Sequence, residues 1–305
     1  MDFIDIQRTS KVFGSGLLTT SPFFFATKNG RFATSQPITE NNTNKSEKLC
    51  WLAIAKKAAL SGGNVAYHYF NKSLEIQKKK VSSVYDNFTL ADVETENKIR
   101  DIISVEFPEH QIIGEEGGSK GSSDYVWHID PIDGTNNYIG RNSDWGVSVG
   151  LAYRKEPIIG AIYFPLSKSL YFAEKGKGAF KNGKRIKCSG TKSLEKSIIC
   201  ISSYFKGENN KEKIITHIKQ IGGKCLGVRM YGCAIKNFAM LAEGQVSAAI
   251  KHKLWSWDAC AGTVLVREAG GEVFSIDGKD WTTDKESVIA ACTNELKKEI
   301  LKLRI

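Results

Sequence analysis

The segment WHIDPIDGTNNY, residues 127–138, holds the feature from which the fold and chemistry of this chain are predicted. Asp130 and Asp133 flank a proline, whose ring fixes one backbone torsion and disfavours helix at the residue before it. We therefore expect a strand to end here in a rigid turn that brings both carboxylates to one point. Gly134 and Thr135 come next, and backbone N–H groups at the start of a following helix or turn would suit a phosphate. The alternative for this segment is an Asx turn in an ordinary loop.

Two further segments supply acids. In GEEGG, residues 114–118, glycines bracket Glu115 and Glu116 and allow the loop to project a carboxylate. In WDACAG, residues 257–262, Asp258 opens a helix rich in small residues. Crowded carboxylates repel one another and are tolerated chiefly beside cations, and hard oxygen ligands favour Mg²⁺. The three segments together predict a magnesium site that handles a phosphate. Taken singly, residues 114–118 would be a surface loop, and Asp258 would only cap its helix.

Composition limits the class of protein. The chain has 305 residues, of which 41% are hydrophobic, and its apolar runs are far shorter than the ~20 residues of a membrane span. Its seven cysteines contain no Cys-x-x-Cys pair, which favours reduced thiols over a disulfide framework or a zinc site. Because the predicted site is acidic, the net charge of +10 places a basic surface elsewhere. Such a surface would steer anionic substrates or bind nucleic acid weakly, and the alternative is an ordinary lysine-rich surface.

The chain divides into an extension and two halves. Residues 1–45 are expected to be a flexible or targeting extension, in which residues 8–39 contain many Ser and Thr and no acid. This composition resembles a plastid or mitochondrial transit segment, and the alternative is a plain extension on a cytoplasmic protein. Residues 46–190 form an N-terminal α+β half with the metal motifs. Residues 191–305 form a C-terminal α/β half that contributes Asp258 and the substrate pocket.

Hydrophobic periodicity predicts a layered α/β sandwich. The first half is expected to be a largely antiparallel sheet with helices on one side. Its predicted helices are 46–71 and 89–107, and its predicted strands are 125–129, 146–153, 158–164 and 169–173. The predicted elements of the second half are strands 198–202 and 246–251 and helices 212–221, 234–243 and 257–269.

One segment imitates a nucleotide-binding loop. Residues 178–184, GAFKNGK, match the start of a P-loop. The next residue is Arg185, where a P-loop has the Ser or Thr that holds magnesium. Because Asn182 and Gly183 are a hairpin signal, we predict a turn between two strands.

With these motifs taken together, the chain resembles the inositol monophosphatase family of magnesium-dependent, lithium-sensitive phosphomonoesterases over roughly residues 47–303. The resemblance implies the αβαβα sandwich of the sugar phosphatases, with two intimate halves. It implies hydrolysis of a small-molecule phosphate monoester by in-line attack of a metal-activated water. It also implies a homodimer.

The resemblance assigns metal ligands by position. Glu115, Asp130 and the backbone carbonyl of Ile132 would hold one Mg²⁺. Asp130, Asp133 and Asp258 would hold a second, and Glu115 would also contribute to a third, weaker ion.

The same resemblance assigns the groups around the phosphate. Asp92 and Thr135 would orient the attacking water. The backbone amides of Gly134 and Thr135 would cradle the phosphate. Arg229, Cys233 and Ala234 occupy the stretch that lines the alcohol side of the pocket in the family.

One position departs from the family pattern. Members that act on inositol phosphates have a glutamate seven residues before the position of Asp258, where it contacts sugar hydroxyls, and this chain has Lys251. A lysine cannot accept those hydrogen bonds, but it can meet a second anionic group. Inositol phosphate therefore becomes one candidate beside sugar or nucleotide bisphosphates, such as fructose-1,6-bisphosphate and 3′-phosphoadenosine-5′-phosphate. Histidinol phosphate is less favoured, because its amine is positive. The alternative is a surface lysine that points away from the pocket.

Two classes of function stay open from the sequence. The first is a phosphatase acting on a small phosphorylated metabolite. The second is a regulatory or RNA-associated protein on the same fold, motivated by the net charge of +10.

Overall fold

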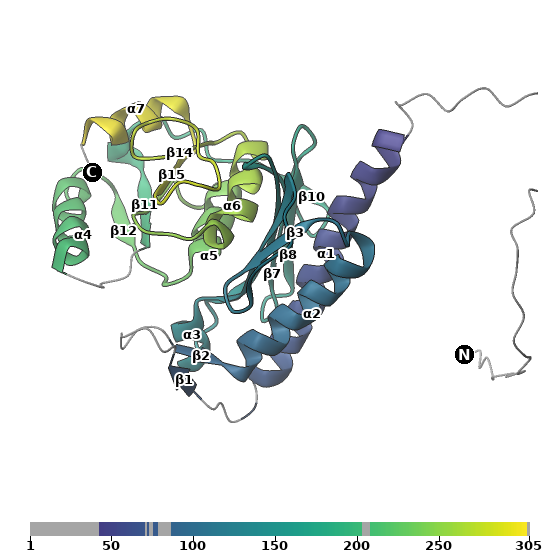
Figure 1. Cartoon of the computed structure of the whole chain (residues 1–305). Helices are drawn as coiled ribbons and strands as arrows, with labels where there is room; N and C mark the ends of the chain where they lie inside the picture. Colours follow the sequence, from purple (N-terminus) through teal and green to yellow (C-terminus); the bar gives the residue numbers. More distant parts are fainter. Residues whose placement is uncertain (1–42, 71, 73–75, 79–86, 203–207, 304–305) are drawn as a thin grey trace, which may run out of the picture. The chain divides into compact units, whose positions relative to one another are not determined.

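Helix α1 (Thr43–Phe70) lies beside helix α2 (Leu90–Glu106), and both cover one face of a large sheet (Figure 1). The computed structural model describes residues 43–70, 72, 76–78, 87–202 and 208–303. Both helices confirm the predicted ones to within a few residues at each end. Thr89 caps α2, because its hydroxyl accepts the N–H of Ala91.

The large sheet has eight strands in the order β10-β9-β8-β7-β6-β5-β3-β4. Only β3 and β5 are parallel neighbours, so the predicted, largely antiparallel sheet is confirmed. Its strands are β3 (Gln111–Gly114), β4 (Gly118–Lys120), β5 (Tyr125–Asp133), β6 (Gly146–Tyr153), β7 (Glu156–Phe164), β8 (Ser169–Glu174), β9 (Gly178–Lys181) and β10 (Lys184–Ile186). The short strands β1 (Ile76–Lys78) and β2 (Asn87–Thr89) pair with each other.

A second sheet of five strands has the order β12-β11-β13-β15-β14. Helices α5 and α6 lie between the two sheets, and α4 and α7 lie on the far side of the second one (Figure 1). This arrangement gives the predicted αβαβα layers. The strands are β11 (Ile198–Ser202), β12 (Gly227–Arg229), β13 (Ala248–Lys251), β14 (Glu272–Phe274) and β15 (Val288–Ala291). The helices are α3 (Thr135–Ile139), the 3₁₀ turn η1 (Leu194–Lys196), α4 (Glu208–Ile221), α5 (Ala234–Ala242), α6 (Ser256–Glu268) and α7 (Asn294–Lys302).

Helices cover both faces of the large sheet, so the expectation of helices on one side is wrong. A Cβ added to Gly150 would lie 2.7 Å from the sulfur of Cys260, and one added to Gly160 would lie 2.4 Å from the carbonyl oxygen of Ala261. Helix α6 therefore packs so closely on β6 and β7 that there is no room for a side chain at these two positions. Tyr163, an odd number of residues from Gly160 in the same strand, faces α1 instead.

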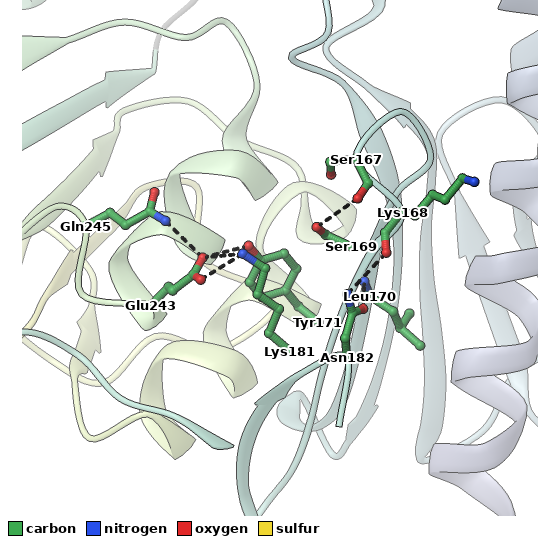
Figure 2. Close-up of polar contacts among 9 residues, drawn as sticks. All are labelled: Ser167, Lys168, Ser169, Leu170, Tyr171, Lys181, Asn182, Glu243 and Gln245. Atoms are coloured by element: carbon green, nitrogen blue, oxygen red, sulfur yellow. Dashed lines mark hydrogen bonds and ion pairs between the residues drawn. The ribbon is translucent and has the colours of Figure 1, made fainter. Parts of the chain in front are cut away.

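A charged contact joins the large sheet to the C-terminal end of α5. The carboxylate of Glu243 accepts the hydroxyl of Tyr171 on β8 at 2.8 Å and the ammonium of Lys181 on β9 at 2.7 and 2.9 Å (Figure 2). The amide of Gln245 donates to the same carboxylate at 3.1 Å. One side chain therefore fixes α5 against two strands.

The segment that imitates a P-loop is a hairpin, as predicted. Strands β9 and β10 pair on either side of Asn182 and Gly183, which have φ angles of 47° and 79°. Positive φ at both central residues is the geometry of a tight hairpin turn. The side chain of Asn182 also accepts the N–H of Leu170 at 2.8 Å (Figure 2).

The predicted extension lies outside the described residues as far as residue 42, and the described structure from Thr43 onward belongs to one compact unit. The division of that unit at residue 190 stays a prediction. Six of the seven cysteines lie in the described residues with placed side chains, and none of these six forms a disulfide. No helix in this part of the chain combines the length and apolar character needed to cross a bilayer.

Candidate active site

Three acids from distant parts of the sequence meet in one buried cluster. Asp130 and Asp133 lie on β5, and Asp258 lies on α6. Each offers a carboxylate oxygen, and these three oxygens all lie within 4.8 Å of one another. The predicted meeting of these carboxylates is therefore present, and we call these residues the acid cluster.

A β-bulge brings the two aspartates of β5 together. The strand continues through Asp133, so the expectation that it ends at Pro131 is wrong. Asp130 pairs with Ser148 and Asp133 with Gly146, so three steps along β5 match two along β6. In a regular strand, residues three apart face opposite sides, and one extra residue returns them to the same side. A proline is tolerated at a bulge because its missing N–H breaks no regular ladder.

The turn after β5 depends on a glycine. Gly134 has a φ of 91°, and a Cβ there would lie 2.6 Å from the carbonyl oxygen of Asp144. Helix α3 starts at the next residue, Thr135, whose hydroxyl donates to the carbonyl of Ile132 at 3.1 Å. The predicted roles of this carbonyl as a metal ligand and of the following amides in phosphate binding stay predictions.

Two of the acids are positioned by the starts of their own helices. Asp258 is the third residue of α6, and its Oδ2 accepts the N–H of Trp255 at 2.8 Å. Asp92 is the third residue of α2, and its Oδ2 accepts the N–H and hydroxyl of Thr89 at 2.8 and 2.7 Å. Asp92 forms a capping box with Thr89, and Asp258 makes the same backward contact to the N-cap backbone without a side-chain cap from Trp255. Asp92 is buried but is not part of the acid cluster.

Asp133 is held by the start of another helix, α5. Its Oδ2 accepts the N–H of Ile235 at 2.6 Å and the thiol of Cys233 at 3.4 Å. Cys233 and Ala234, both expected to line the pocket, are buried here. Arg229 is exposed at the end of β12. The substrate contacts predicted for these three residues stay predictions.

Glu115 lies just beyond the end of β3, next to the acid cluster. Its N–H donates to the carbonyl of Ile129 at 3.3 Å, which places it beside the strand that carries Asp130. Its carboxylate contributes to the raised pKa of Asp130, so the two negative charges are close. Among the described acids, however, Glu115 is not one of the three whose oxygens lie within 4.8 Å.

A residue that the sequence did not reveal holds the Glu115 loop. The buried carboxylate of Glu96 on α2 accepts the N–H of Glu116 and the N–H of Gly117, both at 2.8 Å. The guanidinium of Arg100 donates to the same carboxylate at 2.7 Å. Asp92, Glu96 and Arg100 follow at intervals of four, so they share one face of α2. That spacing was the available signal.

Burial and mutual repulsion disfavour the charged forms of the carboxylates in the acid cluster. Burial raises the pKa of Asp130 well above its ordinary value, and the charges of Glu115, Asp133 and Asp258 raise it further. Burial also raises the pKa of Asp133 to about 6. The positive charge of Lys251 acts in the opposite direction on both carboxyl groups.

Lys251 points into the acid cluster. Its ammonium lies 3.0 Å from Oδ2 of Asp258, and the two side chains are 6% and 4% exposed. The alternative of a surface lysine that points away is therefore wrong. Three carboxylates against one ammonium leave an excess of negative charge, and the donors are all hard oxygens, which fits a divalent cation such as Mg²⁺.

Comparisons with known proteins agree with this geometry. The model of the inositol monophosphatase family matches residues 47–304. A fructose-1,6-bisphosphatase/inositol-1-monophosphatase of Aquifex aeolicus is 36% identical over 232 residues, which cover 75% of this chain and 86% of that protein. The Nus factor SuhB of Pseudomonas aeruginosa is 31% identical over 248 residues, which cover 79% and 91%. The solved structure of an inositol monophosphatase from Anabaena has a TM-score of 0.75 at 28% identity and covers 84% of this chain and 96% of its own.

Proposed function

This chain belongs to the inositol monophosphatase family and is a phosphoric monoester hydrolase, and on that premise we propose a substrate, a metal and roles for the residues. The substrate is a small phosphorylated metabolite, and a sugar or nucleotide bisphosphate is favoured over a simple inositol phosphate. The proposal rests on the acid cluster, in which carboxylate oxygens from β5 and α6 lie within 4.8 Å of one another. Lys251 supports the substrate class, because an ammonium suits a second anionic group better than it suits sugar hydroxyls.

We propose Mg²⁺ as the metal, in two ions with a third, weaker one. Asp130, Asp133 and Asp258 would hold it, together with Glu115 and the carbonyl of Ile132. When bound, such ions neutralise charge on the phosphoryl group and activate water at neutral pH. The family carries out metal-dependent catalysis, and the buried acid cluster supplies the matching oxygen ligands.

The chain's own groups would position the reactants. The Thr135 hydroxyl donates to the Ile132 carbonyl, so its lone pairs are left to accept a hydrogen bond from the attacking water. Asp92, buried and fixed by its capping box, would hold the same water. The amides of Gly134 and Thr135 would hold phosphate oxygens, and Arg229, Cys233 and Ala234 would line the alcohol side.

The test is phosphate release from inositol-1-phosphate, fructose-1,6-bisphosphate, 3′-phosphoadenosine-5′-phosphate and histidinol phosphate. We expect activity that EDTA removes and Mg²⁺ restores. Asp133→Asn should lower kcat at least about a hundredfold. Asp124→Asn is the matched control, because Asp124 is an exposed acid just before β5. Near-normal hydrolysis by a folded Asp133→Asn protein would refute the site.

We propose nucleic-acid binding as a second candidate function, supported by the net charge of +10 and by the relative named as a Nus factor. Binding of RNA should weaken steeply with salt, because it would depend on phosphate contacts by lysine and arginine. It should also survive removal of Mg²⁺ with EDTA. Binding that is insensitive to salt, or absent at low salt, would exclude this candidate.

A further inference from the structure

Lys251 is a buried cation on a rigid element. It is the last residue of β13, an inner strand of the five-stranded sheet, where it pairs with Ser202 on one side and Val288 on the other. A lysine in such a place requires a negative partner, because a buried unpaired ammonium is strongly destabilising. Its ammonium has Asp258 as that partner at 3.0 Å.

The oxygen that Lys251 contacts already has a second donor. Oδ2 of Asp258 accepts the N–H of Trp255 at 2.8 Å, in addition to its contact with the ammonium. The ammonium also acts on the rest of the acid cluster, because Asp130 and Asp133 each offer a carboxylate oxygen within 4.8 Å of one of Asp258. The ammonium therefore offsets part, but not all, of the negative charge of the acid cluster.

A divalent ion in the same place would repel that ammonium. Any ion held by oxygens of the acid cluster would lie within roughly 6 Å of a nitrogen that is itself 3.0 Å from one of them. Charges of +2 and +1 at this separation oppose each other by about a factor of ten in affinity, even with the screening of bulk water. The ammonium of Lys251 therefore weakens binding of a divalent ion at the acid cluster.

We propose that Lys251 competes with the divalent ion for Asp258, so that its ammonium offsets part of the charge of the acid cluster and is displaced when the ion binds. The inference rests on the proposed function, since the ion is the one proposed there. It makes Lys251 a determinant of metal affinity, and metal loading would free a cation for the anionic substrate.

The test measures binding of Mg²⁺ or Mn²⁺ by calorimetry without substrate. Lys251→Met keeps the unbranched shape and most of the length of the side chain and removes its charge, so we expect the Kd to fall at least about tenfold. Lys253→Met is the matched control, because Lys253 is exposed two residues further along, and its Kd should stay within about twofold of wild type. Lys251→Arg retains the charge and should bind the ion about as weakly as wild type. A folded Lys251→Met protein that binds no more tightly than the control would overturn the proposal.

A second measurement uses the unaltered protein, in case Lys251→Met does not fold. Reductive methylation followed by mass spectrometry reports the reactivity of each amine. Lys251 should react slowly in EDTA and faster at saturating Mg²⁺, whereas Lys253 should react equally in both. Equal reactivity of Lys251 in the two conditions would overturn the displacement.

The two proposals fail differently. Wild-type protein that neither binds Mg²⁺ nor releases phosphate would refute the proposed function. Wild-type protein that does both, with binding abolished by Asp258→Asn but unchanged by Lys251→Met, would refute the competition alone.

Discussion

Replacing Glu96 with glutamine tests how the Glu115 loop is held. The Glu96 side chain is 2% exposed, and its two oxygens accept the N–H groups of Glu116 and Gly117 and the guanidinium of Arg100. Glutamine has nearly the same shape, but it has one accepting oxygen and an NH₂ group in place of the other. At least one of the N–H groups that now donate to Glu96 would then face the NH₂ group of the glutamine, which is itself a donor.

The magnitude follows from these contacts. A hydrogen bond to a charged group contributes about 1.5–3 kcal/mol, and a buried donor left without an acceptor costs about 1–3 kcal/mol. The Arg100 side chain is only 14% exposed, so solvent compensates for its lost partner only in part. We expect Glu96→Gln to lower the free energy of unfolding by about 2–4 kcal/mol. Because Glu115 lies in the same loop, Mg²⁺ should also bind about 10–100-fold more weakly, as for other groups that support metal ligands.

The assay is urea unfolding in EDTA, followed by calorimetric titration with Mg²⁺. Glu94→Gln is the matched control, since Glu94 is exposed on the same helix and should change stability by less than about 0.5 kcal/mol. Comparable stability and Mg²⁺ affinity in the two variants would refute the reasoning. It would mean that the loop is held by something other than the Glu96 carboxylate.

Other predictions concern pH, packing and the contact between α5 and the large sheet. The native pKa of Asp133 is about 6 against an ordinary 3.8, so the native protein binds more protons than the unfolded chain between these values. Its Tm in EDTA should therefore fall as pH rises from about 4 to 6, and a rising Tm that Mg²⁺ leaves unchanged would contradict this. Gly160→Ala should lower the free energy of unfolding in urea by about 1–3 kcal/mol, because its Cβ would lie 2.4 Å from backbone of α6. Gly190→Ala is the control for this assay, because a Cβ there would have no atom within 4 Å. Tyr171→Phe should cost about 1–2 kcal/mol in that assay by removing the donor to Glu243, and an unchanged unfolding midpoint would count against the contact.

Local signals in the sequence were sufficient for most helices and strands. Helix α2 shows why, because its apolar residues recur at helical spacing, and this pattern can be recognised without knowing which element the helix packs against. The position of α6 was not readable in the same way. That helix is rich in small residues and buried along most of its length, so periodicity does not say which sheet it covers. The available signal was Gly150 and Gly160, two glycines inside strands, which mark places where another backbone approaches.

The bulge in β5 shows a second limit of local rules. Pro131 was expected to end the strand in a turn, because its ring fixes one backbone torsion and disfavours helix at the residue before it. Whether a strand ends or bulges depends on the neighbouring strand, and here β6 pairs with both Asp130 and Asp133. The expected convergence of the two acids is correct, but its cause is an extra residue in a continuing strand rather than a turn.

The backbone partners of buried side chains could not be predicted from the sequence, even where helical spacing placed such a side chain on the same face as a candidate site residue. Glu96 binds N–H groups 20 and 21 residues away, and every residue type except proline offers that donor. Lys251 was predicted either to face a second anionic group or to point away from the site. It points into the site and contacts Asp258, a pairing that the sequence did not reveal, because the end of β13 and the start of α6 place an ammonium and a carboxylate side by side.

The energetics of the acid cluster support its proposed role as a metal site. Asp258 accepts an N–H at the start of α6, and Asp133 accepts one in the first turn of α5, so two helix dipoles favour the charged carboxylates. Each such contact with a helix start contributes about 0.3–1 kcal/mol at an exposed site and at most ~2 kcal/mol when partly buried. These contributions do not offset burial, because the pKa of Asp133 is still raised to about 6. Lys251 supplies only one positive charge, and well-packed apolar residues would stabilise a purely structural core as well or better. An arrangement that is unfavourable alone and favourable with a divalent cation is what a metal-dependent phosphatase requires.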